Sequence, residues 1–113
     1  MSITSQIEVA SEDVKSMEVP EWLINGQPLK IFWTPMTVKD QKKITQRYPD
    51  FYENIMNIEV QVHILITKAL DEKGDALFDF GDKKWFDDRD PLVVMRVASS
   101  IIQNKTVEEL EKN

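Results

Sequence analysis

The sequence lacks the residues on which several kinds of fold and site depend. None of its 113 residues is cysteine, which excludes disulfide bonds and thiolate metal sites and fits a reducing compartment. Glycine occurs three times and histidine once. No apolar run approaches the roughly 18 residues of a membrane span, and the N-terminal residues have neither the basic start nor the apolar segment of a signal peptide. We therefore expect one soluble, cytoplasmic domain with no cofactor.

Positive charge is also scarce, because the formal net charge is −6. Residues 1–48 carry six basic and six acidic residues, whereas residues 49–113 carry eight basic and fourteen acidic ones. A nucleic-acid-binding domain normally presents a basic surface, so the acidic second half argues against that class. The excess is compatible with a basic protein partner, but a solvated acidic surface that keeps a small protein in solution explains it more simply.

A β-hairpin is predicted near the start of the chain. Asn25-Gly26 tolerates the positive φ angles of a tight two-residue turn. Pro20 and Pro28 remove backbone donors near both strands, which favours a small ribbon with open edges over part of a large sheet. A two-stranded ribbon is not stable alone, so it is expected to pack on the helices that follow. The expected strands are residues 19–24 and 29–33, and the expected anchors are Trp22, Ile31 and Trp33.

The chain before the hairpin is polar and has no clear period. We interpret residues 1–17 as a flexible N-terminal arm and residues 18–113 as a single helical domain that the hairpin, at about 19–33, opens.

Local signals predict the helices that follow. Thr37 and Asp40 form a capping box for a helix at residues 38–48, which Pro49 ends. Asp50 is expected to cap a largely buried helix that ends near residues 71–75, with Gly74 in the left-handed C-terminal position. Its expected apolar stripe is Phe51, Ile55, Ile58, Val62, Leu65 and Ala69, widened by Met56, Val60 and Ile64.

The last third of the chain is predicted as a short turn and two further helices. Asp82 is expected to cap the turn that holds Trp85 and Phe86, and Asp90-Pro91 is a helix start. That helix is expected to stop at Asn104, and a second capping box, Thr106 with Glu109, opens residues 107–112. Its expected buried face is Leu92, Met95, Val97, Ala98, Ile101 and Ile102. The predicted fold is mainly α with a short N-terminal β-hairpin (α+β), as a small single-domain helical bundle.

No catalytic or metal-binding arrangement is found in the sequence. His63 is the only histidine and lies in the middle of a predicted helix beside the apolar stripe, where a packed structural role is expected. A single histidine without a placed partner makes neither a catalytic triad nor a zinc site. We therefore predict a binding or assembly protein that is not an enzyme.

Aromatic and methionine side chains are the candidates for a protein-binding surface, because aromatic anchors dominate interface energetics and methionine adapts to irregular partners. Core packing is the alternative reading, and we prefer it for each tryptophan. The candidates are Trp22, Trp33, Met36, Met56, Trp85, Phe86 and Met95.

The order of these segments resembles that of the tail assembly chaperones of long-tailed bacteriophages. The resemblance covers residues 18–113 and lies in the ribbon that leads into TPMTV at residues 34–38, the phrase ALDEKGDALF at 69–78, the aromatic turn, the Asp90-Pro91 helix and the ending TVEELEKN at 106–113. It implies a non-virion protein of the host bacterial cytoplasm. Such a protein binds the tape measure protein and helps to recruit major tail tube subunits, and it has no catalytic residues.

Two other functions are compatible with the sequence. One is a small acidic adaptor or inhibitor of a basic protein, because residues 71–90 carry eight acidic and four basic residues. The other is a minor structural protein of the tail itself. Because tail proteins often act as rings, the resemblance is also compatible with self-association of this chain into a homo-oligomer.

Overall fold

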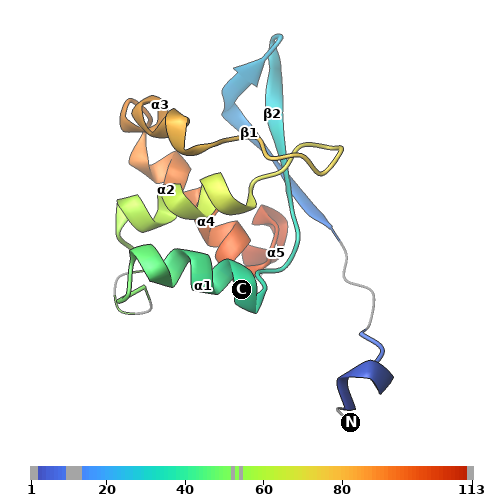
Figure 1. The fold of residues 1–113 in the computed structure, drawn as a ribbon. Coiled ribbons are helices and arrows are strands. Elements are labelled where there is room, and N and C mark those ends of the chain that lie inside the picture. The colour runs from blue at the N-terminus through green and yellow to red at the C-terminus, as the bar shows by residue number, and fades with distance from the viewer. Residues whose placement is uncertain (1–2, 10–13, 52, 54, 112–113) are drawn as a thin grey trace.

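The computed structural model describes residues 3–9, 14–51, 53 and 55–111. It is a small α+β domain in which a two-stranded antiparallel hairpin projects beyond a group of helices (Figure 1). No helix in these residues is long and apolar enough to cross a bilayer. The elements are η1 (Ile3–Gln6), β1 (Lys15–Ile24), β2 (Gln27–Trp33), α1 (Val38–Arg47), α2 (Ile58–Lys68), η2 (Phe80–Asp82), α3 (Lys83–Asp87), α4 (Pro91–Gln103) and α5 (Val107–Glu111).

The predicted hairpin turn is confirmed. Asn25 and Gly26 have φ angles of 53° and 78°, as a tight turn between right-twisted strands requires. The pairing shifts between Val19, which faces Leu29, and Leu23, which faces Pro28. Residues 20–22 of β1 therefore have no pairing partner in β2. The prolines thus lie where the ladder is already irregular, and the three expected anchors, Trp22, Ile31 and Trp33, are all buried.

The hairpin begins earlier than expected. β1 starts at Lys15, which faces Trp33, so residues 15–17 belong to the strand and not to the predicted arm. The Lys15 ammonium group lies 2.9 and 3.1 Å from the two carboxylate oxygens of Glu109, and this pair joins the strand to the second predicted capping box. Residues 3–9 of the arm are exposed, whereas residues 1, 2 and 10–13 lie outside the described residues.

The outer edge of β2 is partly covered, although the sequence predicted open edges. Leu70 and Phe32 exchange two backbone hydrogen bonds of 2.8 and 2.9 Å, and Leu70 forms a second bridge with Ala76. Because Leu70 pairs with the strand, the helical conformation of α2 ends at Lys68. Gly74, with φ of 89°, consequently lies in the turn that joins the two bridging residues and not at the end of the helix, as predicted.

The predicted start of the second long helix is wrong. α2 begins at Ile58, capped by Asn57, whose side-chain oxygen accepts a 2.8 Å hydrogen bond from the Glu59 amide. Of the described residues before it, 49–51, 53, 55 and 56 form turns, and Phe51 is buried. Because the helix starts later, Met56 is 64% exposed and does not extend the apolar stripe. The observed buried face of α2 is Val60, Gln61, His63, Ile64, Leu65, Ile66 and Lys68.

Three of the predicted helix starts are confirmed. The Thr37–Asp40 box, the Asp90 cap and the Thr106–Glu109 box are all present. Before the aromatic turn, however, Asp79 caps η2, and Asp82 instead accepts a hydrogen bond from the Asp79 amide. Lys112, in the predicted last helix, lies outside the described residues.

The predicted buried face of α4 is confirmed at Val97, Ala98 and Ile101 but is wrong at Leu92. Leu92 is 70% exposed and lies one helical turn before Arg96, so it belongs to the outer face. The predicted face combined positions of two different phases, whereas the observed stripe has a single helical phase. The buried residues of α4 are Val93, Val94, Val97, Ala98, Ser100 and Ile101.

The core lies between α2, α4 and the hairpin. α2 and α4 form the most extensive helix pair of the described chain, and β1 and β2 contribute Val19, Ile31 and Trp33, none of which has exposed surface. The Trp33 indole nitrogen donates a 3.1 Å hydrogen bond to the side-chain oxygen of Asn104. Asn104 has the left-handed φ of 52° and ends α4, so one residue both stops the helix and holds the largest core side chain.

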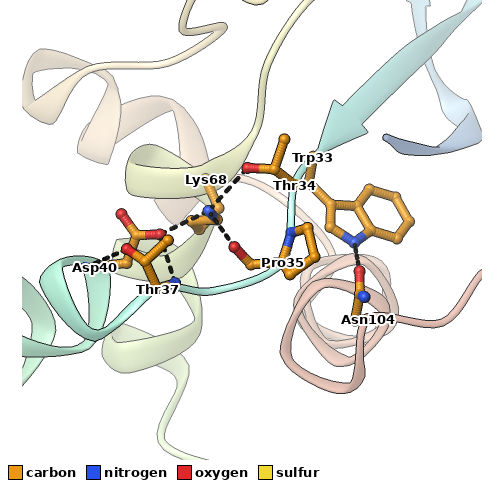
Figure 2. Close-up of polar contacts among 7 residues, drawn as sticks. All are labelled: Trp33, Thr34, Pro35, Thr37, Asp40, Lys68 and Asn104. Atoms are coloured by element: carbon orange, nitrogen blue, oxygen red, sulfur yellow. Dashed lines mark hydrogen bonds and ion pairs between the residues drawn. The ribbon is translucent and has the colours of Figure 1, made fainter. Parts of the chain in front are cut away.

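A buried ammonium group joins three segments below the hairpin (Figure 2). Lys68, only 6% exposed, donates hydrogen bonds to an Asp40 carboxylate oxygen at 2.7 Å and to Thr34 Oγ1 and the Pro35 carbonyl oxygen at 3.3 Å. The same oxygen of Asp40 accepts a 3.0 Å hydrogen bond from the Thr37 amide. One carboxylate therefore caps α1 and neutralises Lys68, the last residue of α2.

Burial opposes the charged form of Asp40, but hydrogen bonds from Lys68 and the Thr37 amide outweigh it and hold the pKa of the carboxyl below its ordinary 3.8. A lowered folded-state pKa means that the carboxylate stabilises the fold above pH 3.8, and that this contribution is lost as the pH falls through the folded-state value.

We predict strong coupling between Asp40 and Lys68. Asp40→Ala should lower the free energy of unfolding by about 3 kcal/mol, because it leaves the Lys68 ammonium buried without a counter-charge. Lys68→Met together with Asp40→Ala should cost less than the two single changes added. Urea unfolding of the four proteins measures the coupling, and additive losses would contradict the ion pair. Lys43→Met, on the exposed face of α1, is the control for loss of a positive charge.

A second prediction concerns acid stability. The difference in unfolding free energy between the wild-type protein and Asp40→Asn should be constant near neutral pH and should shrink as the pH falls below 3.8. Other carboxylates titrate in both proteins, so they largely cancel in this difference. Urea unfolding from about pH 7 to about pH 3 measures it, and a difference that does not change with pH would contradict the lowered pKa.

Candidate functional site

Four aromatic side chains form one contiguous group between the hairpin and α3, which we call the aromatic cluster. All six pairs of rings are in contact, with centroids 4.9 to 6.4 Å apart and mostly edge-to-face. Such geometries stabilise a pair by about 1 kcal/mol beyond its area burial. The members are Trp22 of β1, Phe78 of the segment before η2, and Trp85 and Phe86 of α3.

The cluster has a buried base and an exposed side. Trp22 and Phe86 are 7% and 4% exposed, Phe78 is half-buried, and Trp85 is 38% exposed. The irregular part of β1 contains Trp22 and lets its ring reach the helix side. Trp85 is therefore held by three rings while part of its indole faces solvent.

Arg89 borders the exposed indole. Its guanidinium lies 4.5 Å from the Trp85 ring centroid, and its Nε donates a 3.0 Å hydrogen bond to the Trp85 carbonyl oxygen. A cation stacked in this way keeps the ring in one position and places a hydrogen-bond donor at the rim. The hairpin next to the cluster adds two exposed apolar side chains, Leu23 and Ile24, which are 64% and 57% exposed.

The structure brings together three of the seven sequence-predicted binding residues: Trp22, Trp85 and Phe86. Trp33 has no exposed surface and packs in the core, which is the reading that the sequence favoured for the tryptophans. The methionines lie on separate segments. Met36 and Met95 are half-buried, before α1 and on α4, and Met56 is exposed before α2.

Phe78, Arg89 and the two hairpin residues were not predicted as site residues. Phe78 stands out in the sequence as an aromatic residue seven positions before Trp85, but only the fold shows that the two rings stack. The Asn25-Gly26 turn could have indicated that Leu23 and Ile24 project, because residues beside a tight turn have few neighbours to cover them.

The described residues contain no group of acidic, histidine or cysteine side chains that could hold a metal ion. His63 is buried, as expected for a packed histidine, between the rings of Tyr48 and Phe80 at 5.5 and 5.1 Å. Burial, with Arg47 and Lys83 nearby, lowers the pKa of His63, so the imidazole is neutral at pH 7.

Comparisons with protein-family models, with curated proteins and with solved structures found no match to this chain.

The structure predicts different roles for two tryptophans of the cluster. Trp22→Ala should lower the free energy of unfolding by about 3 to 5 kcal/mol, because it empties the buried base of the cluster. Trp85→Ala should cost roughly 1 to 2 kcal/mol, because part of that ring is already solvated. Chemical denaturation followed by circular dichroism measures both changes. Equal losses would show that Trp85 is as much a core residue as Trp22.

Proposed function

We propose that this chain is a non-catalytic tail assembly chaperone of a long-tailed bacteriophage. In this proposal it works in the cytoplasm of the infected bacterium as a small helical bundle with a projecting hairpin. It binds an amphipathic helix of the tape measure protein and helps to recruit major tail tube subunits. The proposal is supported by the order of segments, which resembles that of such chaperones, and by the aromatic cluster, which offers an exposed apolar surface.

The observation that carries the proposal is the partly exposed indole of Trp85 on three packed rings. An anchor of this kind is already in position, so binding orders few side chains and loses little conformational entropy. The apolar stripe of an amphipathic helix is a matching ligand, because helix-in-groove recognition uses apolar residues spaced three or four positions apart. Leu23 and Ile24 would lengthen this contact along the hairpin.

The acidic adaptor is the weaker candidate. Four of the eight acidic residues between positions 71 and 90 already accept hydrogen bonds from backbone amides in turns and helix caps. Their abundance is therefore explained by local structure without a basic partner. These four residues are Asp71, Asp79, Asp82 and Asp90.

Co-expression with the tape measure protein of the same phage tests the proposal. We expect the wild-type chain to raise the soluble fraction of that protein and Trp85→Ser to reduce this effect. The expected loss of affinity is about 30-fold, from roughly 2 kcal/mol for an aromatic anchor.

Val38→Ser is the matched control, because Val38 is 69% exposed on α1 and is not a member of the aromatic cluster. No gain in tape measure solubility with the wild-type chain would contradict the proposal. Mass spectrometry of purified virions separates a chaperone, which should be absent, from a structural tail protein.

A further inference from the structure

A second surface, independent of the aromatic cluster and of the function proposed above, collects positive charge on this acidic protein. It is an open groove of about 680 Å³ between α1, α2 and η2. The side chains that line it are Lys43, Gln46, Arg47, His63, Ile66, Thr67 and Phe80. None of them is acidic.

Two basic side chains lie against the ring of Phe80. Its ring is 51% exposed, and Arg47 and Lys83 approach it from α1 and α3 at 5.7 and 5.5 Å from the centroid. In the part of the chain that the structure describes, the ion pairs involve Lys15, Lys68 and Arg96 and none of the groove cations. Two cations therefore share one aromatic ring without a carboxylate to neutralise them.

The floor of the groove adds an unusual buried group. His63 is 4% exposed, and its Nδ1 has no hydrogen-bond partner among the described residues. The charged groups that act on its ring are both positive, Arg47 from α1 and Lys83 from α3, and the rings of Tyr48 and Phe80 are in contact with it. The lining of the groove thus includes basic side chains and no acidic one, in a protein of net charge −6, a combination that favours an anionic ligand.

We propose that this groove binds an acidic peptide segment of a partner protein. Its carboxylates would pair with Arg47, Lys83 and Lys43, and an apolar side chain would cover Phe80 and Ile66. The mixture of apolar and cationic lining favours a peptide over inorganic phosphate, which is usually held by converging backbone amides and charged groups. A groove of about 680 Å³ also suits an extended chain better than a small ion.

Binding of a short synthetic peptide of alternating glutamate and leucine, followed by isothermal titration calorimetry, tests the proposal. We expect the double variant Arg47→Gln/Lys83→Gln to weaken binding at least about tenfold, as loss of charge-assisted hydrogen bonds should. The variant Lys39→Gln/Lys42→Gln removes the same charge from exposed positions of α1 that do not line the groove, and it should change affinity less than about twofold. Equal losses in both variants would overturn the site in favour of non-specific attraction.

The pKa of His63 distinguishes direct binding of the peptide by Arg47 and Lys83 from a purely structural role of these two side chains. Carboxylates placed beside Arg47 and Lys83 should raise the pKa of the imidazole by about one unit, because they offset the positive charge around it. An NMR titration of the histidine with and without peptide measures this change. An unchanged histidine pKa in the saturated complex would overturn the assignment.

Three further results bear on the identity of the ligand. Inorganic phosphate that competes with the peptide at equal concentration would overturn the peptide assignment. So would a concentration-dependent dimer that Arg47→Gln/Lys83→Gln abolishes, because the ligand would then be a second copy of this chain. A peptide of alternating lysine and leucine should not bind, and its binding would likewise count against the proposal.

Discussion

The buried ammonium group of Lys68 is the interaction on which the arrangement of the helices depends. It lies at the end of α2, reaches the cap of α1, and holds the loop that connects the hairpin to that helix. An uncompensated charge at this depth would cost several kcal/mol. Its hydrogen bonds to Asp40, Thr34 and Pro35 therefore join α1 and the segment after the hairpin to the end of α2. Trp33, one residue before this loop, fixes the hairpin to the end of α4 in a similar way.

Both proposed surfaces include an aromatic residue of the segment that follows α2. The segment between α2 and α4 alternates its aromatic residues, so that Phe78 packs on Trp22 and the rings of α3 while Phe80 covers His63. One short stretch of chain thereby contributes to an apolar surface beside the hairpin and to a cationic groove beside α1. The two surfaces differ in chemistry, so they suit different parts of a partner or two separate partners.

Local chemistry could be predicted from the sequence, whereas contacts between distant segments could not. The Asn25-Gly26 turn and most of the helix caps depend on residues within four positions of one another, and the structure agrees with them. The predicted start of α2 was wrong because the apolar spacing typical of a helix continues into the residues before it. Phe51 is buried there, but it lies in a turn. Neither the role of Lys68 nor the meeting of Arg47 and Lys83 at Phe80 has a sequence signal, since each joins elements that only folding brings together.

The bridge between Phe32 and Leu70 has a consequence for behaviour at high concentration. An isolated ribbon offers two rows of free amides and carbonyls, along which identical molecules can stack without limit. Here one row is interrupted by the backbone of Leu70, and the strand that forms the other contains Pro20, which lacks an amide hydrogen, within its irregular pairing. Fibril-like growth by strand pairing is thus obstructed at both edges of the hairpin. Contacts with other molecules then depend on side chains, which are more selective than main-chain pairing.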